Sequence, residues 1–344
     1  MSVGAFLTLY AERSFLRAPG AALATVIALA ATFVSSMHGG PQFLYALFMG
    51  VAFHYLSQET RTRPGIEFCA RTILRLGVGL LGVRITIDQI QALGWTVALS
   101  VAAGVVTTLL FGLIACRFFG LTRTQGILSG GAVGICGASA ALAISAVLPR
   151  DKISERFTLM VVVSVTLLST AAMVLYPLLA KWLELPPQLA GLFLGATIHD
   201  VAQVVGAGYT LGQSTGDVAT VVKLFRVAML TVVVIAVSAA FKQSSIEEPA
   251  ARDRSHPARR LVPWFLWLFV AMVLANSFGL FTPAVRGALD SASRGCLVVA
   301  IAALGMKTSF QQLARAGWGS MALILAETVW LAVLMLCVVL FLKP

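Results

Sequence analysis

The stretch Val97–Cys116, VALSVAAGVVTTLLFGLIAC, decides the fold class of this chain. It contains no charged side chain, and about 20 apolar residues at a rise of 1.5 Å each suffice to cross the hydrocarbon core of a bilayer. Leu159–Ala180 is a second such stretch, and similar blocks recur along the whole sequence. Because backbone groups inside lipid must satisfy their own hydrogen bonds, runs that are apolar on every side predict helix.

The composition excludes a water-soluble protein. Of 344 residues, 59% are apolar and 11% are charged, and the mean hydropathy is +0.92. A soluble chain of this kind would lack the polar surface that covers a core. A membrane β-barrel would show short segments of alternating polarity, and the sequence has none. We therefore predict an all-α membrane protein.

Apolar blocks between polar breaks predict about eleven transmembrane helices in a single polytopic membrane domain, 1–344. The first block is longer than the apolar region of a usual signal peptide, so we count it as a span. A polar segment, 242–260, predicts a flexible cytoplasmic linker between spans 8 and 9. The predicted spans are 21–37, 42–57, 70–90, 95–116, 126–148, 158–180, 189–210, 218–240, 263–280, 295–310 and 318–341.

Basic residues predict the orientation. The formal net charge of +11 comes from 25 Lys and Arg scattered between apolar blocks, which is not the single stripe expected of a nucleic-acid-binding protein. With the N-terminus in the cytoplasm, fifteen of them fall on the cytoplasmic side and six, including Arg286 and Arg294, on the other; four lie within spans. Cytoplasmic loops are enriched in Lys and Arg, so we predict a cytoplasmic N-terminus.

An internal similarity predicts inverted repeats. The segment Leu81–Ile90 with Gly94-Trp95 matches Leu304–Leu313 with Gly317-Trp318 without gaps, at an offset of 223 residues. On the predicted spans the two copies would point in opposite directions, as in many transporters. The alternative is that two helix ends share an interfacial Trp and a snorkelling basic residue.

The glycine-rich segment Ser129–Ala140, SGGAVGICGASA, predicts a broken helix. Glycine has poor helix propensity, and an unwound break directs N–H groups and a positive dipole end at one spot, which suits an anion. The alternative role is close packing of small residues between helices. The candidate substrate-binding residues here are Ser129, Gly130, Gly131, Cys136, Gly137 and Ser139.

A second unusual block, Gly195–Gly208, places His199, Asp200 and Gln203 in the middle of a span. Such polar residues are costly in hydrocarbon and should face the bundle interior or a cavity. At helical spacing His199 and Gln203 would share a face, and both are candidate substrate-binding residues. His199 could also carry a proton, or be a histidine satisfied by a neighbouring helix. His199 and Asp200 are candidates for coupling an ion.

Three more ionisable residues lie within predicted spans. Lys223 and Arg226 are three residues apart and would share a helix face, where each could pair with Asp200 or bind an anionic substrate; snorkelling to the interface is the alternative. Glu327 lies in the middle of the last span. It would be protonated, paired with a basic residue or turned towards a cavity, and it is the third candidate for ion coupling.

The sequence lacks the motif of an ATP-driven pump and those of two common classes of metal or redox site. GxxxxGK[ST], HExxH and paired CxxC are all absent, and the five cysteines have no partner at metal spacing. We expect no enzymatic activity, no metal and no cofactor beyond a coupling H⁺ or Na⁺. The expected partners are the lipid bilayer and a small anionic substrate, without nucleic acid, and a homodimer is left open.

Several motifs together resemble the YeiH-type sulfate exporter family of bacterial inner membrane proteins. They are Leu74–Arg84, Ile135–Ala140, His199–Val205, Lys223–Leu230, Asn276–Phe278 and Ala303–Met306. The resemblance spans about 41–318 and implies the broader group of bile acid, arsenite and riboflavin transporters, whose folds use inverted repeats and crossed, broken helices. Glu327 is not part of the family's motifs.

The function expected from residues and resemblance together is secondary transport of a small anion by alternating access. The family name implies export, with sulfate or a sulfonate as cargo. One alternative is a proton- or sodium-coupled antiporter or symporter of another organic solute. A second is a membrane receptor or scaffold that transports nothing.

Overall fold

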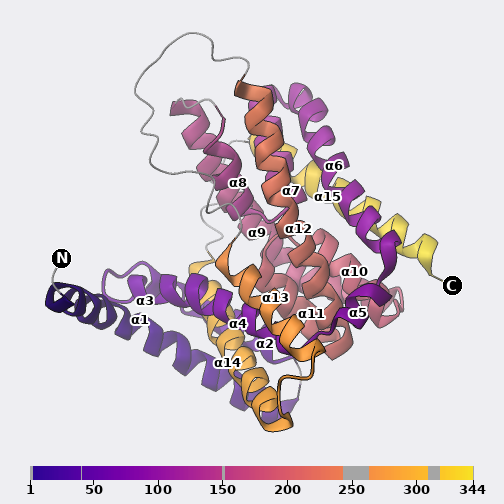
Figure 1. The fold of residues 1–344 in the computed structure, drawn as a ribbon. Coiled ribbons are helices and arrows are strands. Elements are labelled where there is room, and N and C mark those ends of the chain that lie inside the picture. The colour runs from indigo at the N-terminus through magenta and orange to yellow at the C-terminus, as the bar shows by residue number, and fades with distance from the viewer. Residues whose placement is uncertain (1–2, 40, 149–151, 243–262, 309–317, 344) are drawn as a thin grey trace. The chain divides into compact units, whose positions relative to one another are not determined.

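The computed structural model describes residues 3–39, 41–148, 152–242, 263–308 and 318–343. Within these residues every regular element is a helix (Figure 1), which confirms an all-α membrane protein. The count of eleven spans stays a prediction. Six of the described helical segments are long and apolar enough to cross a membrane: Leu16–His38, Gly94–Phe119, Arg156–Trp182, Gln213–Phe241, Pro283–Lys307 and Gly319–Leu342.

Contacts along the chain define two compact units. Unit 1 comprises 1–88 and 267–309, and unit 2 comprises 89–266 and 310–344. Helices α5 (Ile87–Ala92) and α13 (Trp264–Ser277) cross two of the three boundaries between them along the chain. The single domain over 1–344 stays a prediction, and the predicted linker 242–260 lies outside the described residues from 243 onward.

Unit 1 is built around α14 (Pro283–Lys307), which packs against α1, α2 and α4. Its close fit to α2 depends on Gly50, because a Cβ atom added there would collide with the carbonyl oxygen of Ala302. The other elements of this unit are α1 (Val3–His38), α2 (Gln42–Ala52), η1 (His54–Ser57), α3 (Arg63–Phe68), the π-helical η2 (Cys69–Ile73), α4 (Leu74–Leu80) and η3 (Leu81–Arg84).

The start of α14 differs from the sequence prediction. The predicted span begins at 295, whereas the helix begins at Pro283, with the Thr282 hydroxyl accepting a hydrogen bond from the Val285 N–H. Proline is favoured in the first turn and threonine at the N-cap. Arg286 and Arg294, predicted in a loop, therefore lie on the helix. A prediction based on apolar length misses this first half of the helix because it contains charged residues.

Unit 2 is organised around α10 (Pro187–Thr197), whose residues 190–197 are all buried. It packs against α9, α11, α12 and α15. The elements of this unit are α6 (Gly94–Ala115), η4 (Cys116–Phe119), α7 (Arg123–Gly134), α8 (Ala138–Ser145), α9 (Lys152–Trp182), α10, α11 (Val201–Leu211), α12 (Gln213–Lys242) and α15 (Trp318–Leu342). Two predicted spans, 126–148 and 189–210, are each divided into two helices here.

The two copies of the internal similarity share local structure where both are described. Arg84 ends η3 and Lys307 ends α14, and each is followed by an extended residue, Ile85 and Thr308. The matching glycines, Gly82 and Gly305, both approach a neighbouring backbone too closely to admit a Cβ atom. The second copy then runs into 309–317, outside the described residues. The inverted repeat stays a prediction.

Candidate functional site

The glycine-rich segment interrupts a helix, as its composition predicts. A capping box between Thr122 and Gln125 begins α7, which ends at Gly134; a turn over 135–137 follows, and α8 begins at Ala138. Gly137 has φ of +63°, a conformation that a residue with a side chain rarely adopts. The chain can therefore change direction inside unit 2 without continuing the helix.

The second interruption lies between α10 and α11. Ile198 and Asp200 have extended backbone, with ψ of 136° and 141°. The Asp200 carboxylate caps α11 by accepting a hydrogen bond of 2.8 Å from the Ala202 N–H. The backbone N–H of Asp200 donates to the Ser169 hydroxyl at 2.9 Å. The expectation that His199 and Gln203 share a helix face is wrong, because His199 precedes the cap and lies in the break.

Lys223 and Arg226 of α12 join the two interruptions. The Lys223 ammonium donates to the carbonyl of Ile135 at 2.7 Å and to that of Ile198 at 2.9 Å. The Arg226 guanidinium donates to Gly134 at 2.7 and 2.9 Å, Val133 at 2.9 Å, Gly195 at 3.1 Å and Ile198 at 3.2 Å. Both side chains are fully buried. Their predicted common face is confirmed.

The electrostatic role of these cations follows from what they bind. The carbonyls at a helix C-terminus carry a partial negative charge and lack intrahelical partners, and α7 and α10 both end at this point. Among the described residues, neither Lys223 nor Arg226 has a carboxylate oxygen within ion-pair distance. Asp200 is near enough to Lys223 to interact electrostatically. Lys223 therefore has one carboxylate in its surroundings, without an ion pair to it.

His199 and Gln203 are buried beside this junction. The His199 Nε2 atom lies 3.1 Å from the Thr328 hydroxyl, its Nδ1 atom is buried without a hydrogen-bond partner among the described residues, and its Cβ lies 3.4 Å from where a Cβ of Gly137 would be. The Gln203 amide donates to the Thr170 hydroxyl at 2.7 Å. Within the part of the chain that the structure describes, Gln203 Oε1 has no hydrogen-bond partner and is available to a ligand or a water molecule.

The remaining predicted residues of the glycine-rich segment have different surroundings. Gly130 packs against the backbone of α6 near Thr108, and Gly131 packs against the side chain of Ile144, so both serve close helix contact. Cys136 is buried in the break, whereas Ser139 is exposed in the first turn of α8. Ser129 is buried and donates to Glu327 of α15.

Sequence reasoning missed the hydroxyl groups that support the junction. Ser169 binds the Asp200 backbone, Thr170 binds Gln203 and Thr328 binds His199. Isolated Ser and Thr are ordinary in membrane helices, where the hydroxyl bonds to the carbonyl four residues earlier, as it does in Thr170 and Thr328. The adjacent pair Ser169-Thr170 within an apolar span was the one available signal.

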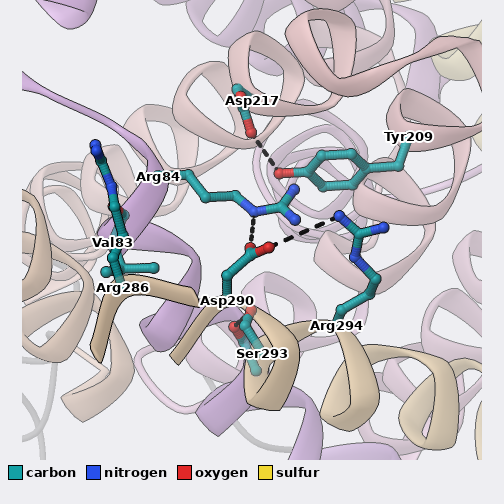
Figure 2. Close-up of polar contacts among 9 residues, drawn as sticks. Val83, Arg84, Tyr209, Asp217, Arg286, Asp290, Ser293 and Arg294 are labelled. Carbon is teal, nitrogen blue, oxygen red and sulfur yellow. Dashed lines mark hydrogen bonds and ion pairs between the residues drawn. The ribbon is translucent and has the colours of Figure 1, made fainter. Parts of the chain in front are cut away.

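Unit 1 contains a separate charged cluster, which Figure 2 shows with Asp290 between Arg84 and Arg294. The Arg84 guanidinium donates to the Asp290 carboxylate and is largely buried, while Arg294 lies one helical turn away at 3.8 Å. Figure 2 also shows a hydrogen bond within unit 2, from the Tyr209 hydroxyl to Asp217 at 2.5 Å. In unit 1 the buried cation is therefore paired with a carboxylate.

Comparison with known proteins supports the membrane assignment. A family model described as Conserved hypothetical protein 698 matches residues 19–324. A UPF0324 membrane protein of Chlorobaculum tepidum is 50% identical over 319 residues, which cover 92% of this chain and 88% of that protein. The UPF0324 membrane protein TauZ of Paracoccus denitrificans is 49% identical over 316 residues, 92% of each chain. These matches confirm the family resemblance drawn from the motifs.

Proposed function

The chain belongs to the family of Conserved hypothetical protein 698, the UPF0324 membrane proteins, and we propose that it is a secondary transporter of a small anion. Transport would proceed by alternating access, in which one bundle of helices moves against another around a central site. The proposed activity needs no nucleophile, metal or cofactor.

One observation carries this proposal: two interrupted helices meet at buried Lys223 and Arg226, and neither cation is in an ion pair within the described residues. Buried charges are usually paired because desolvation is costly. Carbonyl dipoles offset part of that cost, but they leave a net positive charge. An anion that enters the junction would neutralise this positive charge, and a cation would be repelled.

The N-terminus of α8 is the proposed position of the anion. Its cap residue, Gly137, has no side chain that could accept a hydrogen bond from the N–H groups of the first turn, whereas α11 is already capped by Asp200. Lys223 binds the carbonyl of Ile135 two residues before Gly137, and His199 lies beside Gly137. Ser139, in the first turn, adds an exposed hydroxyl. Backbone donors, a cation and an imidazole thus surround one point.

Sulfate or a sulfonate is the proposed cargo, and export the proposed direction, because the family resemblance implies them. The proposed location is the bacterial inner membrane with a cytoplasmic N-terminus, on the distribution of basic residues. Reporter domains fused to each end test this orientation. A cytoplasmic reporter should be active only at the N-terminus if the number of spans is odd, and activity at both ends would reject the predicted topology.

The test of transport is flux through purified protein in liposomes. Vesicles loaded with radiolabelled sulfate, or with a small alkyl sulfonate, should exchange it with the outside at a rate above that of empty vesicles. His199→Ala should reduce this rate by about tenfold or more if the imidazole contributes at least one hydrogen bond to the anion. Normal flux in that variant would remove His199 from the site.

A charge-matched control separates the site from general effects of charge. Lys181→Gln removes a cation from the exposed end of α9, so it should leave flux unchanged, while Lys223→Gln should abolish flux. The orientation and amount of protein in the vesicles must be equal for all variants. Absence of anion flux above empty vesicles for every anion in a broad panel would contradict the proposed function.

A further inference from the structure

Glu327 is a buried carboxyl group outside the anion site just described. It lies on α15, in a segment with the length and composition of a membrane span, and its side chain is completely buried. The Oε1 atom accepts a hydrogen bond of 2.7 Å from the Ser129 hydroxyl of α7. Within the described residues the Oε2 atom has no hydrogen-bond partner. One of the two carboxyl oxygens of Glu327 therefore lacks a hydrogen-bond partner among the described residues.

The elements that pack against α15 provide no counter-ion among their described side chains. These elements are α6, α7, α9, α10 and η4. Neither α6 nor α10 contains a charged residue. The titratable groups without charge that they contribute are Cys116 and Tyr176, and His199 reaches α15 through Thr328. The charged residues described on the other three elements are all exposed: Arg117, Arg123, Arg156 and Lys181.

An ionised carboxylate in this place would be buried without a cation. That arrangement is so costly that a carboxyl group in it takes up a proton instead. The neutral acid needs no counter-ion, and its remaining oxygen becomes an O–H donor. Ser129 can donate to the acid as it does here. The surroundings of Glu327 therefore fit the protonated form.

We infer that Glu327 is the proton-carrying residue of this transporter. In the described conformation it holds a proton on Oε2; when α15 and α7 separate enough to admit water, the O–H bond breaks, the proton passes to water and a carboxylate remains. This step needs no other reactant. Of the three candidates for ion coupling, Asp200 is occupied in capping α11, and His199 contacts Thr328 through Nε2 while its buried Nδ1 has no partner among the described residues. Glu327 is the carboxyl group among them that combines full burial with an unsatisfied oxygen.

The position of Glu327 links its proton to the anion site. Its partner, Ser129, lies on α7, the helix that ends at the first break. The next residue, Thr328, contacts His199 in the second break at 3.1 Å. A carboxylate here would place a second negative charge near a bound anion, so an anion and a proton at Glu327 stabilise the same conformation. This coupling rests on the proposed transport function, whereas the protonated state does not.

The protonated state can be tested without transport. The infrared spectrum of the purified wild-type protein should contain the C=O stretch of a protonated carboxyl group, and Glu327→Gln should lose that band. Gln is neutral and has nearly the same shape as the protonated acid, so this variant should fold normally. Glu184→Gln, at an exposed position, is the control and should retain the band. A wild-type spectrum without the band, or its persistence in Glu327→Gln, would overturn the inference.

Coupling is tested in liposomes that contain a pH-sensitive dye and sulfate. Wild-type flux should move protons together with the anion, and Glu327→Gln should move the anion with no proton. Equal proton movement in both proteins would overturn the coupling, as would a flux that follows a sodium gradient and ignores the proton gradient. If no anion moves in any protein, the transport proposal fails while the infrared band still decides the state of Glu327.

Discussion

Buried basic residues bind different kinds of partner in the two units of the chain. In unit 2, Lys223 and Arg226 donate to backbone carbonyls at the ends of two interrupted helices, with no ion pair among the described residues. In unit 1, Arg84 ends an irregular but continuous helical stretch and binds the Asp290 carboxylate. A cation paired with a carboxylate can serve structure alone. The cations of unit 2 have no ion pair among the described residues, and we propose that they retain charge for a ligand.

The largest expected effect is that of Arg226→Leu. The change removes all side-chain donors to Gly134, Val133 and Gly195, and each buried carbonyl left without a partner costs about 1–3 kcal/mol. We expect a loss of about 3–5 kcal/mol in the free energy of unfolding, measured by denaturation in detergent. A loss of less than about 1 kcal/mol in the free energy of unfolding would mean that the C-termini of α7 and α10 do not depend on this cation.

Lys223→Met should have the next largest effect. Methionine keeps the apolar stem but leaves the carbonyl of Ile135 without its donor, while Ile198 retains Arg226. We expect about 1–3 kcal/mol of destabilisation by the same denaturation measurement. Stability equal to that of the wild type would indicate that water replaces the ammonium and that the two interruptions are joined by Arg226 alone.

Glycine substitutions compare packing in the two units. Gly50→Ala in unit 1 brings a methyl group against the carbonyl oxygen of Ala302, which cannot move without shifting α14, and overpacking of this kind costs about 1–3 kcal/mol. Gly131→Ala in unit 2 meets the end of the Ile144 side chain, which can rotate away. Thermal unfolding of both variants should show the larger loss for Gly50→Ala. The reverse order would contradict the close fit of α2 to α14 that depends on Gly50.

The ion pair of unit 1 should show the smallest effect. A double-mutant cycle with Arg84→Met and Asp290→Asn isolates their interaction. Because 28% of the Asp290 side chain is exposed, we expect a coupling free energy of about 1 kcal/mol, as for partly exposed ion pairs. Anion flux should persist in both single variants. Loss of flux in either would show that unit 1 also takes part in binding or gating.

The sequence predicts the helical fold and the first interruption because their causes are local. Apolar length determines which segments enter the membrane, and the glycines around Gly137 mark a place where a helix cannot easily continue. The start of α14 was missed because Arg286 and Arg294 are exposed charged residues within the first half of that helix. Local apolarity does not distinguish a charged helical turn from a loop.

The partners of the site residues could not be predicted for a related reason. The spacing of Lys223 and Arg226 places them on one face, yet nothing local indicates that carbonyls from two distant breaks lie there. His199 seemed to belong to a helix because the pattern around it is helical, and only the cap at Asp200 excludes it. Likewise the separation of Ser129 and Glu327 by 198 residues hides their hydrogen bond from any sequence pattern.

The central claim, that the two interruptions form an anion site neutralised by a ligand, is tested most directly by a binding titration. Sulfate, a small alkyl sulfonate and chloride would be titrated into the wild type and into folded Lys223→Met, with the unfolding temperature as the readout. Since a ligand stabilises the state that binds it, the wild type should be stabilised saturably by at least one oxyanion, and Lys223→Met should not respond. Equal stabilisation of both proteins would contradict the account.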